Sequence, residues 1–449
     1  MPNRIVRTGI AHAVGAALLT AAGQATAGGF MIVEQSVHEV GRAISGASAA
    51  ADNLGTLFFN PAGITRLEGT RGAAALHVIL PSAEFQGTRT SALSAPASGR
   101  GETDELGLPP NLYLVTDLNA DLKFGLGINA PFGLVTDYDP TWVGRYHAIK
   151  SDLKTINFNP TLGYRASDRL SVGFGISAVY SDVELTNALD SVLVCTGLGG
   201  GSPAAFAACS AGLGTTAGSG AADGLARLEG DDWGFGFNFG LLYQVSDATR
   251  VGFAYRSRVE QTLTGTATST FTLPGVGGVT SVRFIEADLT LPDSASVGIH
   301  HQLDAHWTVL ADIAWNNWSE FDELRATNRA DGSVVLAQPE DWEDTWRYSL
   351  GIEYRPGGAW TFRGGVAFDE TPIPSPELRT PRIPDEDRTW LAFGASYAAS
   401  ANLSIDVAYA HLFVDDARIN NTDASFGYTL TGDYENSVDL VSAQLSYRF

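Results

Sequence analysis

Residues 360–369 read Trp360-Thr361-Phe362-Arg363-Gly364-Gly365-Val366-Ala367-Phe368-Asp369. Apolar and aromatic side chains gather on one face of this segment, and small, polar or charged ones on the other, which is the two-residue period of a β-strand. A tilted strand needs ~9–11 residues to cross a bilayer, whereas strands of globular proteins usually have about 5–6 residues. An apolar face toward lipid and a polar face toward a lumen are typical of a transmembrane barrel.

The same alternation recurs along most of the chain, for example at 170–180 and 347–355. It predicts an all-β transmembrane fold, a fourteen-stranded antiparallel outer-membrane β-barrel, with strands at 71–87, 108–118, 122–138, 150–166, 169–187, 227–245, 249–266, 282–303, 306–321, 342–356, 359–371, 386–399, 402–415 and 434–449. The eighth strand could be divided at Pro292, but we keep it whole because bacterial barrels of this kind have an even number of strands.

The predicted connections alternate between tight turns and long loops, as they do in outer-membrane barrels. The long loops are expected at residues 188–226, 267–281, 322–341, 372–385 and 416–433. The longest of them is rich in Gly, Ala and Ser, and we assign it no secondary structure.

The composition agrees with a membrane barrel and excludes other classes of protein. Charged residues make up 17% of the 449 residues, below the usual ~25%. Acidic residues outnumber basic ones 50 to 28 and no basic stripe is visible, so we expect no nucleic-acid partner. Outside the N-terminus no run of ~18 apolar residues could form a transmembrane helix. A membrane protein without such helices must be a closed barrel, because an open sheet edge in lipid leaves backbone groups unpaired.

The first 27 residues have the pattern of a secretory signal peptide. Arg4 and Arg7 supply the positive charge, residues 9–22 are small and apolar, and Ala25-Thr26-Ala27 is a small-x-small cleavage site. We expect cleavage after Ala27 and export toward the outer membrane of a Gram-negative cell. The alternative is a short amphipathic first helix of the folded protein.

Two further features agree with export to the outer membrane. Cys195 and Cys209 are the two cysteines, and we expect them to form a disulfide in an oxidising compartment; no His or acidic cluster beside them points to a metal. The chain ends on Phe449 after the alternating residues Val441, Leu445 and Tyr447. A terminal Phe closing such a strand resembles the signal read by the barrel-assembly machinery, which we expect as a partner during biogenesis.

Residues 28–69 do not alternate, and small residues and short helical segments predominate there. The interior of a barrel this wide cannot be filled by side chains of the wall alone. We therefore predict that residues 28–69 form a hatch inside a barrel of residues 70–449. A periplasmic tail is the alternative, but apolar residues such as Phe30, Ile32 and Phe59 argue against free solution.

Several motifs together resemble the FadL/OmpP1/TodX family of outer-membrane transporters of long-chain fatty acids, which includes relatives that handle toluene-like hydrocarbons. The motifs are Gly41-Arg42-Ala43, Asn60-Pro61-Ala62, Ala130-Pro131-Phe132-Gly133-Leu134, Trp142-x-Gly144-Arg145-Tyr146, Leu289-Thr290-Leu291-Pro292 and Arg382-Ile383-Pro384-Asp385-x-Asp387-Arg388-x-Trp390. The resemblance runs from about Gly28 to Phe449 and covers the whole mature chain.

The resemblance implies a mechanism as well as a fold. Asn60, Pro61 and Ala62 would lie in the hatch. The third strand would kink inward near Asn129, Ala130, Pro131, Phe132 and Gly133, where Pro cannot donate to the ladder and Gly permits a bend. A hydrophobic ligand would be captured at the cell surface, held in a lumen pocket and released sideways through the kink by passive diffusion. Phe30 would occupy the pocket in the empty state.

A fatty-acid carboxylate inside the lumen needs a cation or hydrogen-bond donors. Alternation places Arg256, Arg258, Arg347 and Arg363 on inward faces, and Arg347 is the first candidate because aromatic residues flank it. Lumen ion pairs are the alternative role for each of these arginines. Relatives carry Lys or Arg near 181–187 and 342–347, where this chain has acidic residues, and fewer lumen cations would suit a neutral hydrocarbon better.

Other functions have weaker support in the sequence. A general diffusion porin would need an open lumen, which the hatch argues against, and a lipid hydrolase would need a Ser/His pair that is not evident. We find no nucleotide-binding loop and no metal-binding spacing, so we expect no cofactor, no metal and no enzyme activity. The expected surroundings are outer-membrane lipid and lipopolysaccharide, and the expected state is a monomer. Binding of divalent ions by the acidic loops is an alternative to a solvated acidic surface.

Overall fold

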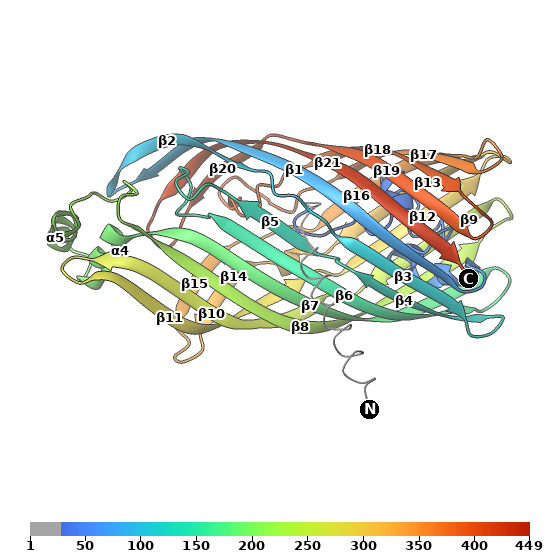
Figure 1. Ribbon diagram of the computed structural model, residues 1–449, viewed down its shortest axis with the longest axis horizontal. Coiled ribbons are helices and arrows are strands. Elements are labelled where there is room, and N and C mark those ends of the chain that lie inside the picture. Colours follow the sequence, from blue (N-terminus) through green and yellow to red (C-terminus); the bar gives the residue numbers. More distant parts are fainter. Residues whose placement is uncertain (1–27) are drawn as a thin grey trace, which may run out of the picture.

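The computed structural model describes residues 28–449, so the predicted signal peptide lies outside the described residues. The described chain forms one elongated antiparallel barrel with short helices inside it and at one end (Figure 1). The strands are β1 Arg71–Ser91, β2 Ser94–Thr103, β3 Pro110–Asp117, β4 Leu122–Asn129, β5 Gly133–Asp137, β6 Lys150–Arg165, β7 Leu170–Asp190, β8 Asp223–Gln244, β9 Thr249–Arg256, β10 Val259–Leu273, β11 Gly277–Leu291, β12 Ser294–Gln302, β13 Trp307–Asn316, β14 Glu323–Asn328, β15 Val334–Pro339, β16 Thr345–Tyr354, β17 Trp360–Asp369, β18 Arg388–Ala398, β19 Leu403–Val414, β20 Ala417–Thr422 and β21 Thr429–Arg448. The helices are α2 Val37–Val40, α3 Thr56–Phe59, η1 Pro61–Arg66, α4 Ser191–Leu198, α5 Pro203–Leu213 and η2 Trp318–Glu320.

The hydrogen-bonded ladders close the sheet into a ring near the chain termini. Within residues 28–449 the ring runs β1-β3-β4-β6-β7-β8-β9-β12-β13-β16-β17-β18-β19-β21, and β21 pairs back with β1 from Arg71↔Arg448 to Thr90↔Thr429. These fourteen members confirm the predicted barrel. The other strands extend the wall at the opposite end, where the long loops lie.

The exterior of the barrel is apolar, which is the reverse of a soluble protein. In β16 the exposed Trp346, Tyr348, Leu350 and Ile352 alternate with buried, mostly polar residues. Exposed aromatic residues also line the end with the short turns: Tyr164, Tyr243, Trp307, Trp360, Tyr397 and Tyr447. Such a ring is the aromatic girdle that outer-membrane barrels place at the lipid boundary. Among residues 28–449 no helix has the length and apolarity to cross a bilayer.

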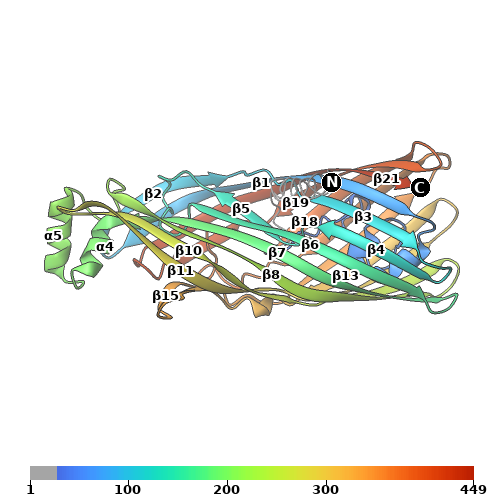
Figure 2. The ribbon, with the colours of Figure 1, turned by 60° about the horizontal axis from the view of Figure 1, so that its bottom comes forward.

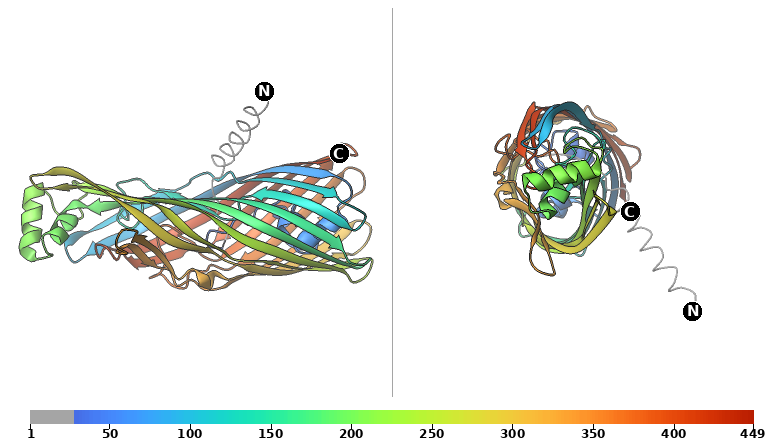
Figure 3. Two further views of the ribbon diagram at one scale, coloured as in Figure 1. Left: turned by 90° about the horizontal axis from the view of Figure 1, so that it is seen from below. Right: turned by 90° about the vertical axis from the view of Figure 1, so that its left-hand side faces the viewer.

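Residues 28–70 precede β1 and lie inside the barrel, where the end-on view in Figure 3 shows them within the ring of strands. Ile32, Val37 and Ile44 pack against Trp390 and Leu440 of the wall. The wall carries glycines where the hatch approaches most closely. A Cβ at Gly365 would collide with the carbonyl of Arg42, so only glycine permits this contact.

Besides the strand predicted at 122–138, which divides into β4 and β5 at the expected kink, two predicted strands are broken. The strand predicted at 249–266 divides into β9 and β10 around Ser257, and the one predicted at 282–303 divides into β11 and β12 at Pro292. The prediction of one unbroken eighth strand was therefore wrong, because Pro292 has no N–H to donate to the ladder. The ring still has an even number of members, since β9 and β12 alone complete it near the termini.

The loop predicted at 188–226 without secondary structure contains two helices, which project from the end of the barrel (Figure 2). Asp190 caps α4 by accepting from the N–H groups of Val192 and Leu193, and Pro203 starts α5 after the capping Ser202. Capping residues of this kind define short helices even in a stretch of low complexity. Cys195 and Cys209 join the two helices by a disulfide, with Cα atoms 5.9 Å apart.

Candidate functional site

The third member of the ring bends inward between Asn129 and Gly133 and is hydrogen-bonded there to the N-terminal segment. The Ile32 N–H donates to the Pro131 carbonyl at 2.9 Å, and the Gly133 N–H donates to the Phe30 carbonyl at 2.9 Å. The Gln35 side chain adds a bond from Nε2 to the Ala130 carbonyl at 2.8 Å. The hatch therefore supplies the backbone partners that a neighbouring strand would otherwise supply.

Above the kink, the wall lacks a ladder on one side of β5. The strand pairs with β6 from Gly133↔Lys154 to Asp137↔Lys150. Among the described residues no ladder joins its other edge to β1, β2 or β3, and one bond from the Asp137 N–H to Thr103 Oγ1 at 2.9 Å crosses the gap. A cavity of ≈ 40 Å³ lies against this edge, lined in part by Ala83, Thr103, Val135 and Thr136.

Phe30 fills an aromatic cage on the lumen side of the kink. Its ring lies 4.7 Å from Trp318, 5.5 Å from Phe321, 5.7 Å from Trp342 and 6.1 Å from Phe132, measured between centroids. The side chain is 2% exposed. Edge-to-face pairs at these separations are favourable.

The family resemblance implied a pocket for Phe30, but three of the four cage walls were not predicted. Trp318 lies in η2, Phe321 directly follows it, and Trp342 follows β15. The strands predicted at 306–321 and 342–356 include all three residues, but β13 ends at Asn316 and β16 begins at Thr345, so the prediction was wrong there. Their aromatic character in an otherwise polar loop was the available signal.

A second cavity, of ≈ 60 Å³, lies between the hatch, the kink and the wall. Its lining includes Met31 and Phe59 of the hatch, Phe132 of the kink, and the wall residues Arg256 and Arg347. Arg347 is 7% exposed, and no carboxylate of residues 28–449 lies within the 4.0 Å of an ion pair with it. A buried cation without an ion pair can receive an anionic group.

The carboxyl of Glu34 is buried close to this cavity. Burial raises the pKa of Glu34 to about 7, against the opposing effect of the Arg388 and Arg347 charges. Neither of its carboxyl oxygens has a hydrogen-bond partner in the described chain. The raised pKa reduces the negative charge on Glu34 near neutral pH, which leaves more of the charge of Arg347 available to a ligand.

The other candidate arginines have different surroundings. Arg256 donates to the Phe58 carbonyl at 3.0 Å and lies 4.3 Å from the Phe58 ring centroid. Arg363 is bound to Glu353 at 2.9 Å, away from the cavity. Arg258 was predicted to face inward, but it is exposed and pairs with Glu320 at 2.5 Å. The inward direction of Arg258 was inferred from the alternation of the strand, and that alternation ends at the break at Ser257.

Asn60, Pro61 and Ala62 fasten the hatch to the wall. The Asn60 side chain donates to the Ser48 carbonyl at 2.6 Å and to the Leu241 carbonyl of β8 at 2.9 Å. Its Oδ1 accepts from the Ala62 N–H at 3.0 Å and so caps η1. Pro61 occupies the first position of that helix, where its missing N–H costs nothing.

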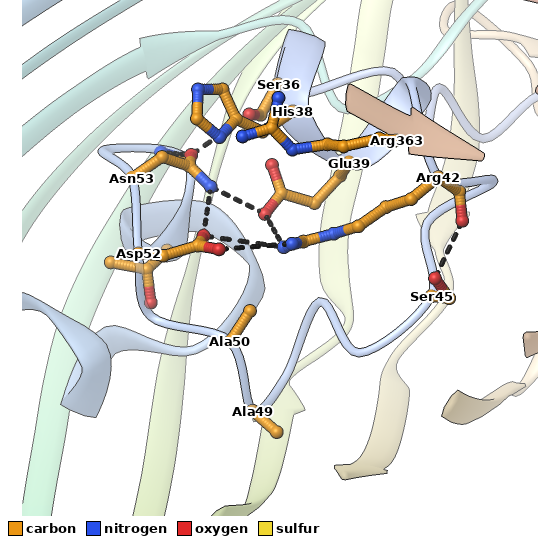
Figure 4. Close-up of polar contacts among 12 residues, drawn as sticks. Ser36, His38, Glu39, Arg42, Ser45, Ala49, Ala50, Asp52, Asn53 and Arg363 are labelled. Atoms are coloured by element: carbon orange, nitrogen blue, oxygen red, sulfur yellow. Dashed lines mark hydrogen bonds and ion pairs between the residues drawn. The ribbon is translucent and has the colours of Figure 1, made fainter. Parts of the chain in front are cut away.

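A buried ionic cluster holds the opposite side of the hatch (Figure 4). Arg42 lies 2.8 Å from Glu39, 3.1 Å from Asp52 and 4.0 Å from Glu353 of the wall. Burial alone would raise the pKa of Asp52, but the positive charge of Arg42 holds that pKa well below its ordinary value. His38 adds a contact to Asp406 at 2.9 Å. The sequence marked Arg42 through a motif and gave no sign of its partners.

Comparison with known proteins agrees with this architecture. The family model for outer membrane protein transport proteins (OMPP1/FadL/TodX) matches residues 18–449. The chain is 32% identical over 438 residues to the long-chain fatty acid transport protein of Escherichia coli (strain K12), covering 95% of this chain and 96% of that protein. It is 31% identical over 444 residues to the 47 kDa outer membrane protein of Pasteurella multocida (strain Pm70), covering 96% and 97%.

Solved structures share the fold. A FadL homologue of Pseudomonas aeruginosa superposes with a TM-score of 0.82 at 24% identity, covering 94% of this chain and 100% of that one. The toluene transporter TodX of P. putida gives a TM-score of 0.71 at 20% identity, covering 92% and 97%. The chain therefore belongs to the OMPP1/FadL/TodX family of outer membrane transport proteins.

Proposed function

We propose that this protein takes up long-chain fatty acids or similar hydrophobic compounds by passive diffusion and releases them sideways through the kink between β4 and β5. One observation carries the proposal: Phe30 fills the aromatic cage while its backbone carbonyl binds Gly133 of the kink. A ligand that enters the cage must displace Phe30. Displacement of Phe30 then weakens the hydrogen bonds that hold the kink and the unpaired edge of β5. The name of the E. coli relative, a long-chain fatty acid transport protein, supports the same class of ligand.

The energetics favour displacement by a long chain. Each methylene removed from water contributes ~0.8 kcal/mol, so roughly fifteen of them contribute about 12 kcal/mol. Exposing a Phe side chain costs about 1.5–3 kcal/mol. The lumen cavity of ≈ 60 Å³ is too small for such a chain, so binding requires movement of its lining, and Phe30 is the side chain that fills the adjoining cage.

Arg347 is the group that we propose for the carboxylate. It lines the lumen cavity, is almost fully buried and has no ion pair within the described chain. A charge-assisted bond in a dry site is about twice as strong as a neutral one. Arg256 lines the same cavity, but its donors are used by Ser177 and Phe58.

A second candidate ligand class is the monoaromatic hydrocarbons. The side chain of Phe30 is itself a methylbenzene, and the cage around it already accommodates one such ring. A free aromatic ring would fill the same space without needing Arg347. The two ligand classes therefore differ in their dependence on one residue.

Displacement of a fluorescent long-chain fatty acid from the purified mature protein tests both classes, with oleate and toluene as competitors. We expect displacement by oleate, weakened in Arg347→Ala and retained in Arg100→Ala, an exposed arginine outside the lumen cavity. Displacement by toluene alone, with no effect of Arg347→Ala, would move the protein to the hydrocarbon class. Absence of probe binding in the wild type would refute uptake of either class.

Two rival functions have separate tests. A general diffusion porin predicts steady ion conductance through single channels, whereas the buried hatch predicts a closed lumen. An outer-membrane lipid hydrolase predicts release of fatty acid from phospholipid by the purified protein. Conductance at porin levels, or hydrolysis above background, would replace the proposal.

A further inference from the structure

Four arginines line one pocket at the end of the barrel that carries the short turns, which faces the periplasm in outer-membrane barrels. Arg66 comes from η1 of the hatch, Arg165 and Arg169 flank the turn between β6 and β7, and Arg250 lies in β9. The pocket has a volume of ≈ 320 Å³. We call this set of four arginines and the space between them the rim pocket.

The arginines of the rim pocket have no acidic partners, in contrast to several other cations of the barrel. Across residues 28–449, no carboxylate lies within 4.0 Å of any of the four. Glu68 and Asp168 also line the pocket, but both are exposed and neither forms an ion pair there. At the other end, Arg145, Lys150 and Arg227 lie 2.7, 2.9 and 3.0 Å from carboxylates.

The absence of acidic partners is not due to a shortage of acidic residues, because the chain has 50 acidic residues and 28 basic ones. Arginines gathered in one cavity without carboxylates repel each other, and that repulsion is relieved when an anion binds between them. An unpaired basic pocket on an acidic protein therefore indicates a site for an anion from outside the chain.

Neutral groups hold three of the four guanidinium groups of the rim pocket in place. Arg250 is 5% exposed and donates from Nε to the Ala49 carbonyl at 2.6 Å, and from Nη2 to the Ala50 carbonyl. Arg165 donates to the Thr65 carbonyl at 2.9 Å. Arg66 donates to Gln244 Oε1 at 3.2 Å. These partners orient Arg250, Arg165 and Arg66 without contributing a negative charge of their own.

We propose that the rim pocket binds a phosphate group. Guanidinium forks match the geometry of carboxylate and phosphate oxygens. Donors can reach the pocket from the hatch, from the β6–β7 turn and from β9, and a phosphate offers more acceptor oxygens to such a divided set than a carboxylate does. Because Arg66 belongs to the hatch and the others to the wall, bound phosphate bridges the two and fastens the hatch. The source is either a free phosphate solute or the head group of an inner-leaflet phospholipid.

Isothermal titration calorimetry on the purified mature protein in a neutral detergent tests the proposal. The ligands are inorganic phosphate, dihexanoyl phosphatidylglycerol and, as a carboxylate control, acetate, all at matched ionic strength. The test variant combines Arg66→Gln with Arg169→Gln, since both side chains are exposed and neither holds a hatch carbonyl. The matched control is Arg448→Gln, which lines a different pocket on the same face.

We expect phosphate binding that weakens roughly tenfold or more in the double variant and is unchanged in Arg448→Gln. Binding of the short-chain lipid without binding of inorganic phosphate would assign the site to a phospholipid head group. Equal binding of acetate would overturn the phosphate assignment. Absence of binding by both phosphate ligands, or equal affinity in the double variant, would overturn the site itself.

Discussion

Replacing Phe30 with Ala isolates the step in which a ligand displaces the ring from its cage. The ring is 2% exposed and contacts four aromatic neighbours. Burial of a Phe side chain contributes about 1.5–3 kcal/mol, and an aromatic pair adds ~0.5–1.5 kcal/mol. A seated ring that is favoured by about 3 kcal/mol lowers the apparent affinity of a competing ligand by about a hundredfold.

We therefore expect Phe30→Ala to bind oleate about a hundredfold more tightly than the wild type does, because its cage is already empty. Displacement of a fluorescent fatty acid at equilibrium measures the change. Phe321→Ala is the matched control, since it removes a cage wall that the ligand itself would contact and should weaken binding. An unchanged or weaker affinity for oleate in Phe30→Ala would refute the competition between ring and ligand.

Three further predictions concern the hatch and the wall. Arg42→Gln leaves buried carboxylates uncompensated and should lower the free energy of unfolding by about 3–5 kcal/mol, measured in urea against Arg418→Gln, whose side chain is 80% exposed. Burial raises the pKa of Glu34 from 4.5 to about 7, so the native state keeps a proton that the unfolded chain loses, and the free energy of unfolding should fall by up to about 3 kcal/mol as pH rises from 4.5 to 7. Urea titrations at both pH values check this, and Glu34→Gln should remove the contribution of Glu34 to the dependence. Thr103→Cys with Asp137→Cys, in a chain whose native cysteines are Ser, should form a disulfide across the gap beside β5 and stop fatty-acid uptake into vesicles until reductant is added; uptake at the wild-type rate when oxidised would refute lateral release.

The ring of strands was predictable because one physical rule governs every member of it. A side chain that faces lipid must be apolar and its neighbour, which faces the lumen, need not be, so alternation marks each strand whatever its partners. The rule fails where the wall breaks. Arg258 was assigned inward by counting from Arg256, but the break at Ser257 ends the count, and the side chain lies outside and pairs with Glu320.

The site was less predictable because its parts lie in connections, some of which the sequence analysis assigned to the strands at 306–321 and 342–356. Trp318 and Trp342 meet Phe30 only after η2 and the β14–β15 hairpin have folded over the lumen. The resemblance to the family supplied the kink and the hatch, yet it did not indicate that Arg42 would be held by Glu39 and Asp52. Pairings across the hatch depend on chain positions that are distant in sequence, and a single sequence carries no signal for them.

The wall has three breaks: the first between β4 and β5, the second between β9 and β10, and the third between β11 and β12. All three lie around the same apolar cluster, which includes Phe30, Phe132, Val259 and Leu291. A regular strand directs half of its side chains outward. Where a ladder is interrupted, more of the neighbouring side chains can line a pocket in the lumen. Each interruption leaves backbone groups that must find other partners, and those partners differ.

Ser257 Oγ accepts from the Phe237 N–H at 2.8 Å, and the Gln261 side chain bonds the Val179 carbonyl at 3.1 Å, so the second break is sealed by the wall itself. At the third break Pro292 has no N–H to satisfy. The break between β4 and β5 alone, among the described residues, draws its partners from the segment that carries Phe30. A ligand in the cage can therefore weaken that break and leave the other two intact, which is why we assign lateral release to the kink at Ala130–Phe132.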